Sequence, residues 1–363
     1  MLIEIINTEI DLENSLKRIV ITNLLNSFRM GYHIIVFENE VLEKIIKSEH
    51  FGTNEKSYAR ELKNRKRLFF HSIKLLLYKV IVDFDNEFSL ISSRDYTINV
   101  SYKYFIDNNL NPTKLLAEDI IDTKLYKLIT NFYISKENNL KGIRILFDEA
   151  HGGGNGTKKR FDEFKSKNVL CLCLVDNDKK HPNGKRGTTI AKFHSKDFLL
   201  DKTVLAYNIG VHEIENLIPC YIINKIMENA NKNEYSSKQI ESLDILKKLV
   251  YVNPDIKKYF DHKLGITSKN IIEWDTDYGD FWLPIIKDIV KNNCLISRKC
   301  TCKFECKVLY GFSNSLLEKS LEFINKESIG SIDKNLPDFL KNIWLEIGKV
   351  ILGWSCSLEK VRC

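Results

Sequence analysis

The chain has little that would place it in a membrane or in the secretory pathway. Its 363 residues contain no run of about 18 uncharged apolar residues, the length that a membrane-spanning helix needs. The first residues include Glu4 and Asp11 and lack the basic and apolar pattern of a signal peptide. Repeats and low-complexity segments are also missing. We therefore expect a soluble, cytoplasmic protein that does not bind membranes.

Charge and cysteine content agree with that location. The formal net charge of +7 is small, so the overall balance is weak evidence for a nucleic-acid ligand. Nine cysteines are an odd number, and Cys171 and Cys173 lie inside an apolar run, where a free cysteine behaves as a small hydrophobic residue. We expect reduced thiols, as the cytosol maintains them.

The chain is long for one domain, and its patterns divide it into three segments. Residues 1–112 mix helical patterns with short extended pieces and end at the turn signal Asn111-Pro112. Residues 226–363 are mainly helical. In the first segment we expect helices at 12–25 and 58–80 and strands at 33–37 and 96–100.

Residues 113–225 alternate between strand and helix patterns, which predicts a parallel sheet with helices on its faces. The expected strands are 114–117, 143–147, 169–175 and 203–207, and the expected helices begin near residues 120 and 158. A glycine loop, Gly152–Gly156, follows the second strand. We therefore expect an α/β fold. Its parallel sheet, with helices on both faces, is flanked by an N-terminal α/β segment and a C-terminal helical domain.

Two of these apolar runs end abruptly in carboxylates. Glu118 closes the first strand and Asp122 lies one helical turn further on, while Asp176 and Asp178 follow the third strand. Ligands of parallel sheets gather outside the carboxyl ends of the strands. Four carboxylates converging there would repel one another, and a divalent cation is the natural compensation.

These motifs together resemble the Toprim fold of topoisomerases, bacterial primases and OLD-type nucleases. The resemblance rests on Glu118 with Asp122, the glycine loop, Asp176-Asn-Asp178, and Val211-His-Glu-Ile-Glu215-Asn-Leu217 after the fourth strand. Asp119 stands where the family usually has glycine. The last motif looks most like stand-alone Toprim nucleases of anti-phage defence, some of which work with an ABC-type ATPase. The resemblance implies a Toprim-like catalytic domain at 113–225.

Phosphodiester hydrolysis needs neutralised phosphate charge and a deprotonated water, and two cations held about 4 Å apart achieve both. Asp176, Asp178 and Glu118 are hard oxygen ligands that suit Mg²⁺ or Mn²⁺. Glu118 would ligate the metal or act as general acid or base. The expected catalytic set is Glu118, Asp176, Asp178 and Lys180, and Asp122 is a further expected ligand. Alternatively, these acids cap helices and pair with surface lysines.

Two glutamates follow the fourth strand, in a stretch expected to open a helix. In the resembling nucleases the glutamate of the Ile-Glu-Asn triplet belongs to the metal site, which points to Glu215. Glu213 is the alternative, because residues two apart on a helix do not face the same way. Both acids would otherwise complement the helix dipole.

A glycine loop and a basic loop are the expected contacts to nucleic acid. Gly153 permits close backbone approach to a phosphate at a helix N-terminus, and a plain flexible turn is the alternative. Lys179, Lys185 and Arg186 lie just after Asp178 and would hold flanking phosphates. A solvated loop is the alternative for them.

A cysteine cluster lies in the last segment. Four thiolates within thirteen residues would close a tetrahedral structural zinc site, and basic residues surround them. The spacing lacks paired Cys-x₂-Cys knuckles, so ordinary reduced cysteines are the alternative. Cys356 and Cys363 are substitute ligands. The cluster consists of Cys294, Cys300, Cys302 and Cys306.

The sequence thus predicts a metal-dependent endonuclease of the Toprim type that cleaves DNA or RNA, an antiviral effector with an ATPase partner. Nucleotidyl transfer, as in primases, uses the same metal site but needs companion domains that the chain does not show. The non-enzymatic alternative is a degenerate Toprim module that binds nucleic acid or a partner ATPase. Acids at every motif argue against it.

Overall fold

The computed structural model describes residues 1–88, 91–107, 110–231 and 234–361, apart from the side chain of Asn155. The chain forms two compact units, and neither is a continuous stretch. The first unit comprises residues 1–174, 194–207 and 344–363, and the second comprises 175–193 and 208–343. This division differs from the expected boundaries after residues 112 and 225, because the segments expected as 113–225 and 226–363 each contribute to both units.

The N-terminal part of the first unit contains a five-stranded sheet with the order β2-β1-β3-β5-β4. Pairs β1–β2, β1–β3 and β3–β5 are parallel, and β4–β5 is antiparallel. The strands are β1 (Leu2–Ile5), β2 (Ile34–Val36), β3 (Lys79–Asp83), β4 (Ile91–Arg94) and β5 (Thr97–Ser101), and the helices are α1 (Ser15–Met30), α2 (Asn39–Lys47) and α3 (Thr53–Ile73), with a 3₁₀ turn at Tyr102–Phe105. α1 and α2 both pack against α3.

Several expectations for this part are confirmed. Helices occupy the expected patterns, and β2 and β5 lie where strands were expected. The helix expected at 58–80 ends at Ile73, since residues 79–83 alternate between buried and half-buried and form β3. Asn14 caps the N-terminus of α1 with a side chain that accepts hydrogen bonds from two helix amides, and Gly31, with φ of 69°, caps its C-terminus.

A second sheet has the order β10-β9-β6-β8. β6 pairs in parallel with both β8 and β9, as the alternating pattern predicted. The strands are β6 (Lys114–Ala117), β8 (Asp148–His151), β9 (Cys171–Val175) and β10 (Val204–Asn208). Every residue of β9 is buried, including Cys171 and Cys173, which explains its continuous apolar run. The coarse fold class, α/β with parallel sheets, is confirmed.

The second strand of this sheet is not the one expected at 143–147. Within that stretch only β7 (Arg144–Ile145) forms, and it pairs antiparallel with β13 (Cys356–Ser357) instead. The place beside β6 belongs to β8, a polar strand whose residues Glu149 and His151 are exposed. β8 lies at the sheet edge, where one side of the strand meets solvent, so no apolar run marks it.

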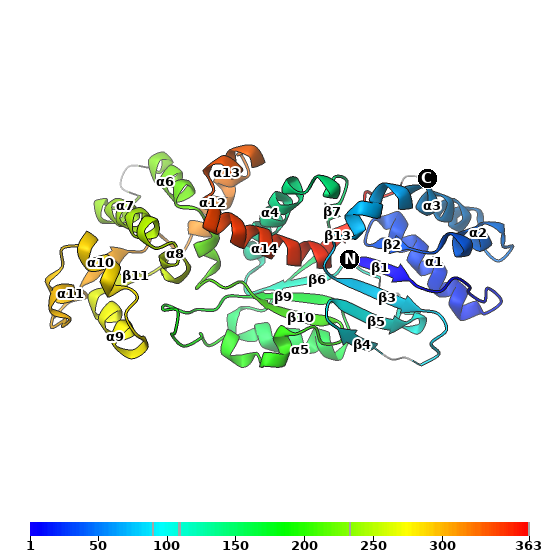
Figure 1. Cartoon of the computed structure of the whole chain (residues 1–363), viewed down its shortest axis with the longest axis horizontal. Helices are drawn as coiled ribbons and strands as arrows, with labels where there is room; N and C mark the ends of the chain where they lie inside the picture. The colour runs from blue at the N-terminus through cyan, green and yellow to red at the C-terminus, as the bar shows by residue number, and fades with distance from the viewer. Residues whose placement is uncertain (89–90, 108–109, 232–233, 362–363) are drawn as a thin grey trace. The chain divides into compact units, whose positions relative to one another are not determined.

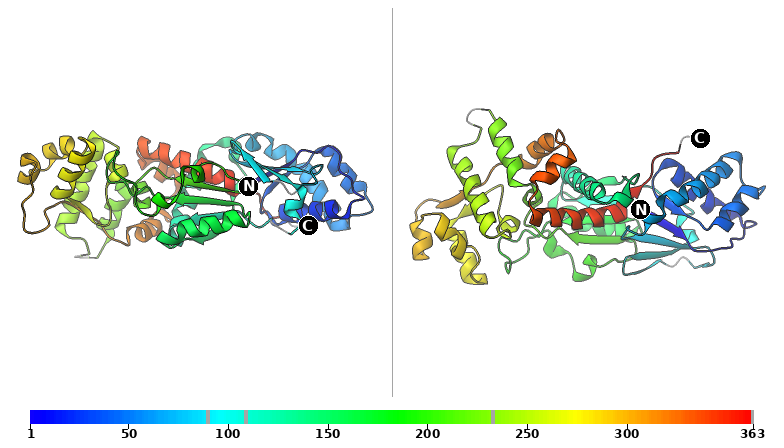
Figure 2. Two further views of the ribbon diagram at one scale, coloured as in Figure 1. Left: turned by 90° about the horizontal axis from the view of Figure 1, so that it is seen from below. Right: turned by 45° about the horizontal axis from the view of Figure 1, so that its top comes forward.

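Helices cover both faces of this sheet (Figure 1, Figure 2), with α4 (Ile120–Lys136) and the end of α14 (Asp338–Ser355) on one side and α5 (Thr157–Ser166) on the other. Phe132 of α4 meets Trp344 edge-on, with ring centroids 5.4 Å apart. A Cβ atom at Gly348 would lie 2.6 Å from the Cβ of Tyr133, so glycine permits this close helix packing. A 3₁₀ turn at Asn138–Leu140 follows α4.

The second unit is mainly helical. A short antiparallel pair, β11 (Gly265–Thr267) with β12 (Lys307–Tyr310), is its only sheet among the described residues. Its helices are α6 (Cys220–Asn229), α7 (Ser237–Val252), α8 (Ile256–Tyr259), α9 (Ser268–Tyr278), α10 (Leu283–Ile289), α11 (Asn293–Ser297), α12 (Leu316–Ile324) and α13 (Ile329–Asn335). Across the described ranges, no helix has the length and apolar character needed to span a membrane.

Candidate metal and nucleic-acid site

Glu118 and Asp122 lie in the first unit, at the turn from β6 into α4. The carbonyl of Glu118 accepts a hydrogen bond from the amide of Gly153 over 3.1 Å. Asp122 is buried, and its Oδ2 accepts from the amide of Asp119 over 2.9 Å, while Asp119 accepts from the Ile121 amide. This capping box fixes the start of α4. A role for Asp122 as a metal ligand stays a prediction.

Gly153 adopts a left-handed conformation with φ of 63°, which glycine reaches without a steric penalty. Its amide is engaged by the Glu118 carbonyl, so it is not available to a phosphate in this conformation. The loop therefore ties β8 to the end of β6, two neighbouring strands. Contact between Gly153 and nucleic acid stays a prediction.

The second unit brings two of the predicted motifs together. Asp176, Asn177 and Asp178 run beside the segment from Val211 to Ile214 and are joined to it by three hydrogen bonds. The Asn177 amide donates to the Val211 carbonyl over 3.0 Å, and the Asp178 amide donates to the His212 carbonyl over 2.9 Å. The Ile214 amide donates to Oδ2 of Asp176 over 3.1 Å. The third and fourth motifs are thus one local structure.

Asp178 is held in an unusual conformation against a glycine. Its φ is 54°, in the left-handed region that aspartate tolerates better than most residues. A Cβ atom at Gly187 would lie 2.0 Å from Oδ2 of Asp178, and the Gly187 amide donates to the Asn177 carbonyl over 3.2 Å. Sequence reasoning missed Gly187, although a glycine that closes a basic loop beside an acidic motif is a readable signal.

Glu213 and Glu215 do not obey the helical spacing that was expected to separate them. The predicted helix is a 3₁₀ turn at Ile214–Leu217, and Glu213 precedes it in extended conformation. Lys263 Nζ lies 3.2 Å from Glu213 Oε2 and 3.2 Å from Glu215 Oε1. The expectation that the two carboxylates face different ways is wrong, because the i, i+2 rule applies only inside a helix.

A buried cluster of ionisable groups surrounds these glutamates. One potential ligand atom from each of His212, Glu213 and Asp261 lies within 4.8 Å of the others, a spacing that a metal ion could bridge. Lys180 Nζ lies 2.9 Å from Asp261 Oδ2. Sequence reasoning missed Asp261, since it lies 85 residues after Asp176 in a segment with only helical patterns. Lys180, expected in the catalytic set, pairs with Asp261, and its catalytic role stays a prediction.

The charged groups in this cluster shift one another's pKa values. Burial and the neighbouring Glu215 raise the pKa of Glu213. Burial alone would raise the pKa of Asp261, but His212 and Lys180 outweigh it and hold that pKa well below its usual range. Burial would lower the pKa of Lys263, yet Glu213 and Glu215 raise it above the ordinary value. Lysines therefore compensate part of the buried negative charge.

The basic loop after Asp178 divides into two kinds of side chain. Lys179 Nζ donates to the Pro182 carbonyl over 3.0 Å, so it supports the loop itself. Lys185 and Arg186 are exposed. Both line a hollow of about 220 Å³ together with Asp178, and Trp274 and Tyr278 of α9 form part of the same lining. The hollow thus combines cations, an acid and aromatic rings.

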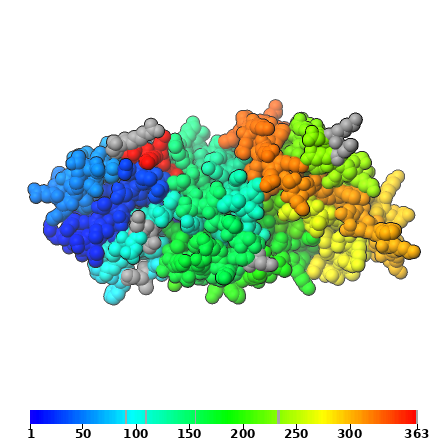
Figure 3. Space-filling model, turned by 180° about the vertical axis from the view of Figure 1, so that it is seen from behind, coloured from blue at the N-terminus to red at the C-terminus, as the bar shows by residue number. Residues whose placement is uncertain are grey.

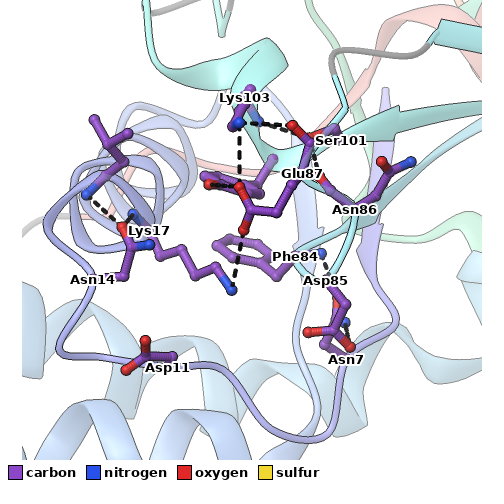
Figure 4. Close-up of polar contacts among 12 residues, drawn as sticks. Asn7, Asp11, Asn14, Lys17, Phe84, Asp85, Asn86, Glu87, Ser101 and Lys103 are labelled. Carbon is purple, nitrogen blue, oxygen red and sulfur yellow. Dashed lines mark hydrogen bonds and ion pairs between the residues drawn. The ribbon is translucent and has the colours of Figure 1, made fainter.

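The N-terminal sheet carries a second Asp-x-Asp motif, Asp83 with Asp85, which sequence reasoning missed. Figure 4 shows Asp85 beside Asn7. Asp83 ends β3, and the side-chain amide of Asn7 donates to Asp83 Oδ1 over 3.2 Å and to Asp85 Oδ2 over 2.9 Å. Asn7 Oδ1 accepts from the Phe84 amide over 2.7 Å. The short apolar run at residues 80–82, followed by Asp83 and Asp85, would have indicated a strand that ends in acids. Here the acids tie the end of β3 to the residues after β1.

The four predicted cysteines meet in the second unit. The sulfur atoms of Cys294, Cys300, Cys302 and Cys306 all lie within 4.8 Å of one another. Of the proposed substitute ligands, Cys356 is buried in β13 of the first unit, and Cys363 lies outside the described residues. The four clustered sulfur atoms match in number the ligands of a structural zinc site.

The structure assigns the remaining predicted ligands to different units. Glu118 directly follows β6 in the first unit, whereas Asp176, Asp178 and Glu215 belong to the second. The groups of potential ligand atoms that lie within 4.8 Å of one another among the described residues include none of these four acids. Their convergence on one metal centre stays a prediction. Comparison of the chain with protein-family models, with curated proteins and with solved structures finds no match.

Proposed function

We propose that this chain is a divalent-metal-dependent endonuclease of the Toprim type that hydrolyses phosphodiester bonds in DNA or RNA. The observation that carries the proposal is the joining of Asp176-Asn177-Asp178 to the segment from Val211 to Ile214 by three hydrogen bonds. That arrangement places two acidic motifs of a nuclease pattern side by side. Glu118, the first acid of the same pattern, is included in the proposal through the resemblance alone.

The donor set suits a hard cation. Asp176, Asp178 and Glu215 offer carboxylate oxygens, which Mg²⁺ and Mn²⁺ prefer. Glu215 is buried, and its Oε2 has no hydrogen-bond partner within the described part of the chain, although its Oε1 meets Lys263. A buried carboxylate oxygen without a partner is costly unless a cation meets it. When bound, the metal would neutralise the phosphate and activate water.

The protein's own residues would orient the substrate. Lys185 and Arg186 are exposed beside Asp178 and would hold phosphates on either side of the cleaved bond. Trp274 and Tyr278 line the same hollow and offer rings on which unpaired bases stack. Gly187 keeps the Asp178 carboxylate in place, because only a residue without Cβ leaves room for it. These features favour a single-stranded or locally unpaired substrate.

A non-catalytic module is the second candidate, and one observation favours it. Lys263 already bridges Glu213 and Glu215, and Lys180 pairs with Asp261, so protein cations neutralise part of the acidic cluster without a metal. Such a module would bind nucleic acid or a partner protein. An ABC-type ATPase partner and a role in anti-phage defence remain part of our proposal through the resemblance of the Glu215 motif.

Cleavage tests separate the two candidates. The purified chain, alone and with the proteins encoded beside its gene, is incubated with labelled DNA and tRNA in Mn²⁺, Mg²⁺ or chelator. We expect cleavage with metal, none in chelator, and loss of cleavage in Asp178→Asn, with Asp162→Asn on the exposed side of α5 as the matched control. Binding without cleavage under every condition would establish the non-catalytic module.

A further inference from the structure

The four clustered cysteines come from a short segment of the second unit, in which Cys302 is exposed and the other three are half-buried. Cys294 lies in α11, Cys300 and Cys302 lie in the following loop, and Cys306 directly precedes β12. In Figure 3 this part of the chain, gold to orange, lies at the surface. The segment is thus bounded by two regular elements and bends back on itself between them.

The sulfur spacing distinguishes a metal site from a disulfide. Sγ of Cys294 lies 3.6 Å from Sγ of Cys302, and all four sulfur atoms lie within 4.8 Å of each other. A disulfide requires about 2.05 Å between its sulfur atoms. A tetrahedral zinc with bonds of about 2.3 Å places its sulfur ligands about 3.8 Å apart. The observed separation therefore matches an edge of a zinc tetrahedron.

Neighbouring polar groups support one of the sulfur atoms. The side-chain amide of Asn292 lies 3.6 Å from Cys306 Sγ as a donor, and Ser268 Oγ lies 3.3 Å from the same sulfur. Oδ1 of Asn292 also accepts from the amides of Cys294 and Leu295 and so caps α11. One residue thus orients two of the four cysteines, as outer partners of metal ligands commonly do.

The loop has little else to hold it in place. Residues 301–305 are all exposed, including Phe304, and they belong to no helix or strand. A segment that buries no apolar side chain gains almost nothing from the hydrophobic effect, while its ordering costs conformational entropy. A bound metal supplies the missing free energy, since structural zinc contributes directly to folding.

We propose that Cys294, Cys300, Cys302 and Cys306 bind one structural Zn²⁺ that orders residues 294–306 and fixes them to β12. The site is closed by four thiolates, so it leaves no position for a substrate and serves stability. Nearby basic residues, Arg298, Lys299, Lys303 and Lys307, offset the charge of four thiolates on a divalent ion. The proposal stands independently of the nuclease activity.

Metal content of the full chain purified under reducing conditions provides the test. We expect one equivalent of zinc by elemental analysis. Replacement of zinc by Co²⁺ should give the visible absorption and the thiolate charge-transfer bands of a tetrahedral sulfur site. Cys302→Ser and Cys306→Ser should each lose zinc and lower the melting temperature. Cys220→Ser, which changes a half-buried cysteine outside the cluster, should retain the full equivalent.

Three results would overturn the proposal. One is wild-type protein without zinc that also fails to give the tetrahedral cobalt spectrum on reconstitution. Another is iron in place of zinc. The third is a full zinc equivalent retained in both cluster variants. The cobalt spectrum uses the unaltered chain, so it remains decisive even if the variants fold poorly.

Discussion

A Cβ atom at Gly187 would lie 2.0 Å from Oδ2 of Asp178, so the two residues can occupy their positions only with glycine at 187. Gly187→Ala should push the Asp178 carboxylate away from its present place. Overpacking of this kind costs about 1–3 kcal/mol of stability. If Asp178 binds metal, its displaced carboxylate stabilises the transition state less. We expect the cleavage rate to fall by about tenfold or more, since a loss of about 1.36 kcal/mol of transition-state stabilisation slows a reaction tenfold.

Gly156→Ala is the matched control for that experiment. No atom lies within 4 Å of a Cβ built at Gly156, and its φ of −83° suits any residue. Its effect on stability should stay within about 0.5 kcal/mol, as for ordinary surface changes. Equal melting temperatures and equal cleavage rates for both alanine variants would show that Gly187 does not position Asp178.

Asn216, the last residue of the Ile-Glu-Asn triplet, is a structural tie. It is fully buried, its Nδ2 donates to the carbonyls of Lys257 and Phe260, and its Oδ1 accepts from the Glu213 amide. Asn216→Ala leaves three buried backbone groups without partners, at about 1–3 kcal/mol each. We expect at least about 3 kcal/mol of lost stability in urea denaturation.

The exposed Asn229 provides a control for Asn216. Its side chain donates one hydrogen bond to the Lys225 carbonyl, and Asn229→Ala should change stability by less than about 0.5 kcal/mol. A loss at Asn216 no greater than that at Asn229 would contradict the structural role. It would then favour a functional reason for asparagine at this position.

His33 should make the first unit sensitive to mild acid. The ring is fully buried; Nε2 lies 3.1 Å from the Asn111 carbonyl and Nδ1 lies 3.2 Å from the Met1 nitrogen. Burial holds the pKa of His33 well below its usual value. Below about pH 6.5 His33 therefore takes up a proton in the unfolded chain but stays neutral in the folded chain. The free energy of unfolding is highest above that pH and falls as the pH decreases, by up to about 1.4 kcal/mol per pH unit.

Urea denaturation between pH 7.5 and 5.5 measures this effect. His33→Gln should remove the component of the slope that His33 contributes. His71→Gln, at an exposed ring, is the control for the substitution itself. An unchanged slope in His33→Gln would mean that other groups cause any acid sensitivity.

The sequence predicted the elements that are determined by patterns of neighbouring residues. Apolar runs that end in acids located β6 and β9, and helical periodicity located α4 and α5. β8 was not predicted, because an edge strand needs no apolar run. Asp261 was not predicted as a site residue, because it lies near His212 only after α8 and the turn that follows it have folded. No local sequence pattern encodes that proximity.

The same distinction applies inside the candidate site. The sequence singled out Glu213 and Glu215 but placed them on a helix, where their carboxylates would diverge. In the structure Glu213 is extended, and Lys263 forms ion pairs with both carboxylates. The identity of the residues was readable, whereas their mutual geometry depended on a lysine 48 residues further along the chain than Glu215.

Asp176→Asn tests the metal-binding role while preserving the local fold. The Ile214 amide donates to Asp176 Oδ2, and an asparagine oxygen can accept the same hydrogen bond. If Asp176 gathers with other acids around a cation, as the proposal holds, removing one charge relieves repulsion, and the metal-free variant should be as stable as the wild type or more stable. A capping or salt-bridge role predicts lost stability instead.

Thermal melts with and without Mn²⁺, combined with cleavage assays, test the central claim most directly. A metal that binds only the folded site stabilises it, by about 2.7 kcal/mol at a concentration one hundred times the Kd. We predict a clear rise in melting temperature for the wild type, a much smaller rise for Asp176→Asn, and no cleavage by the variant. Equal rises in both proteins, with cleavage retained by Asp176→Asn, would contradict the account.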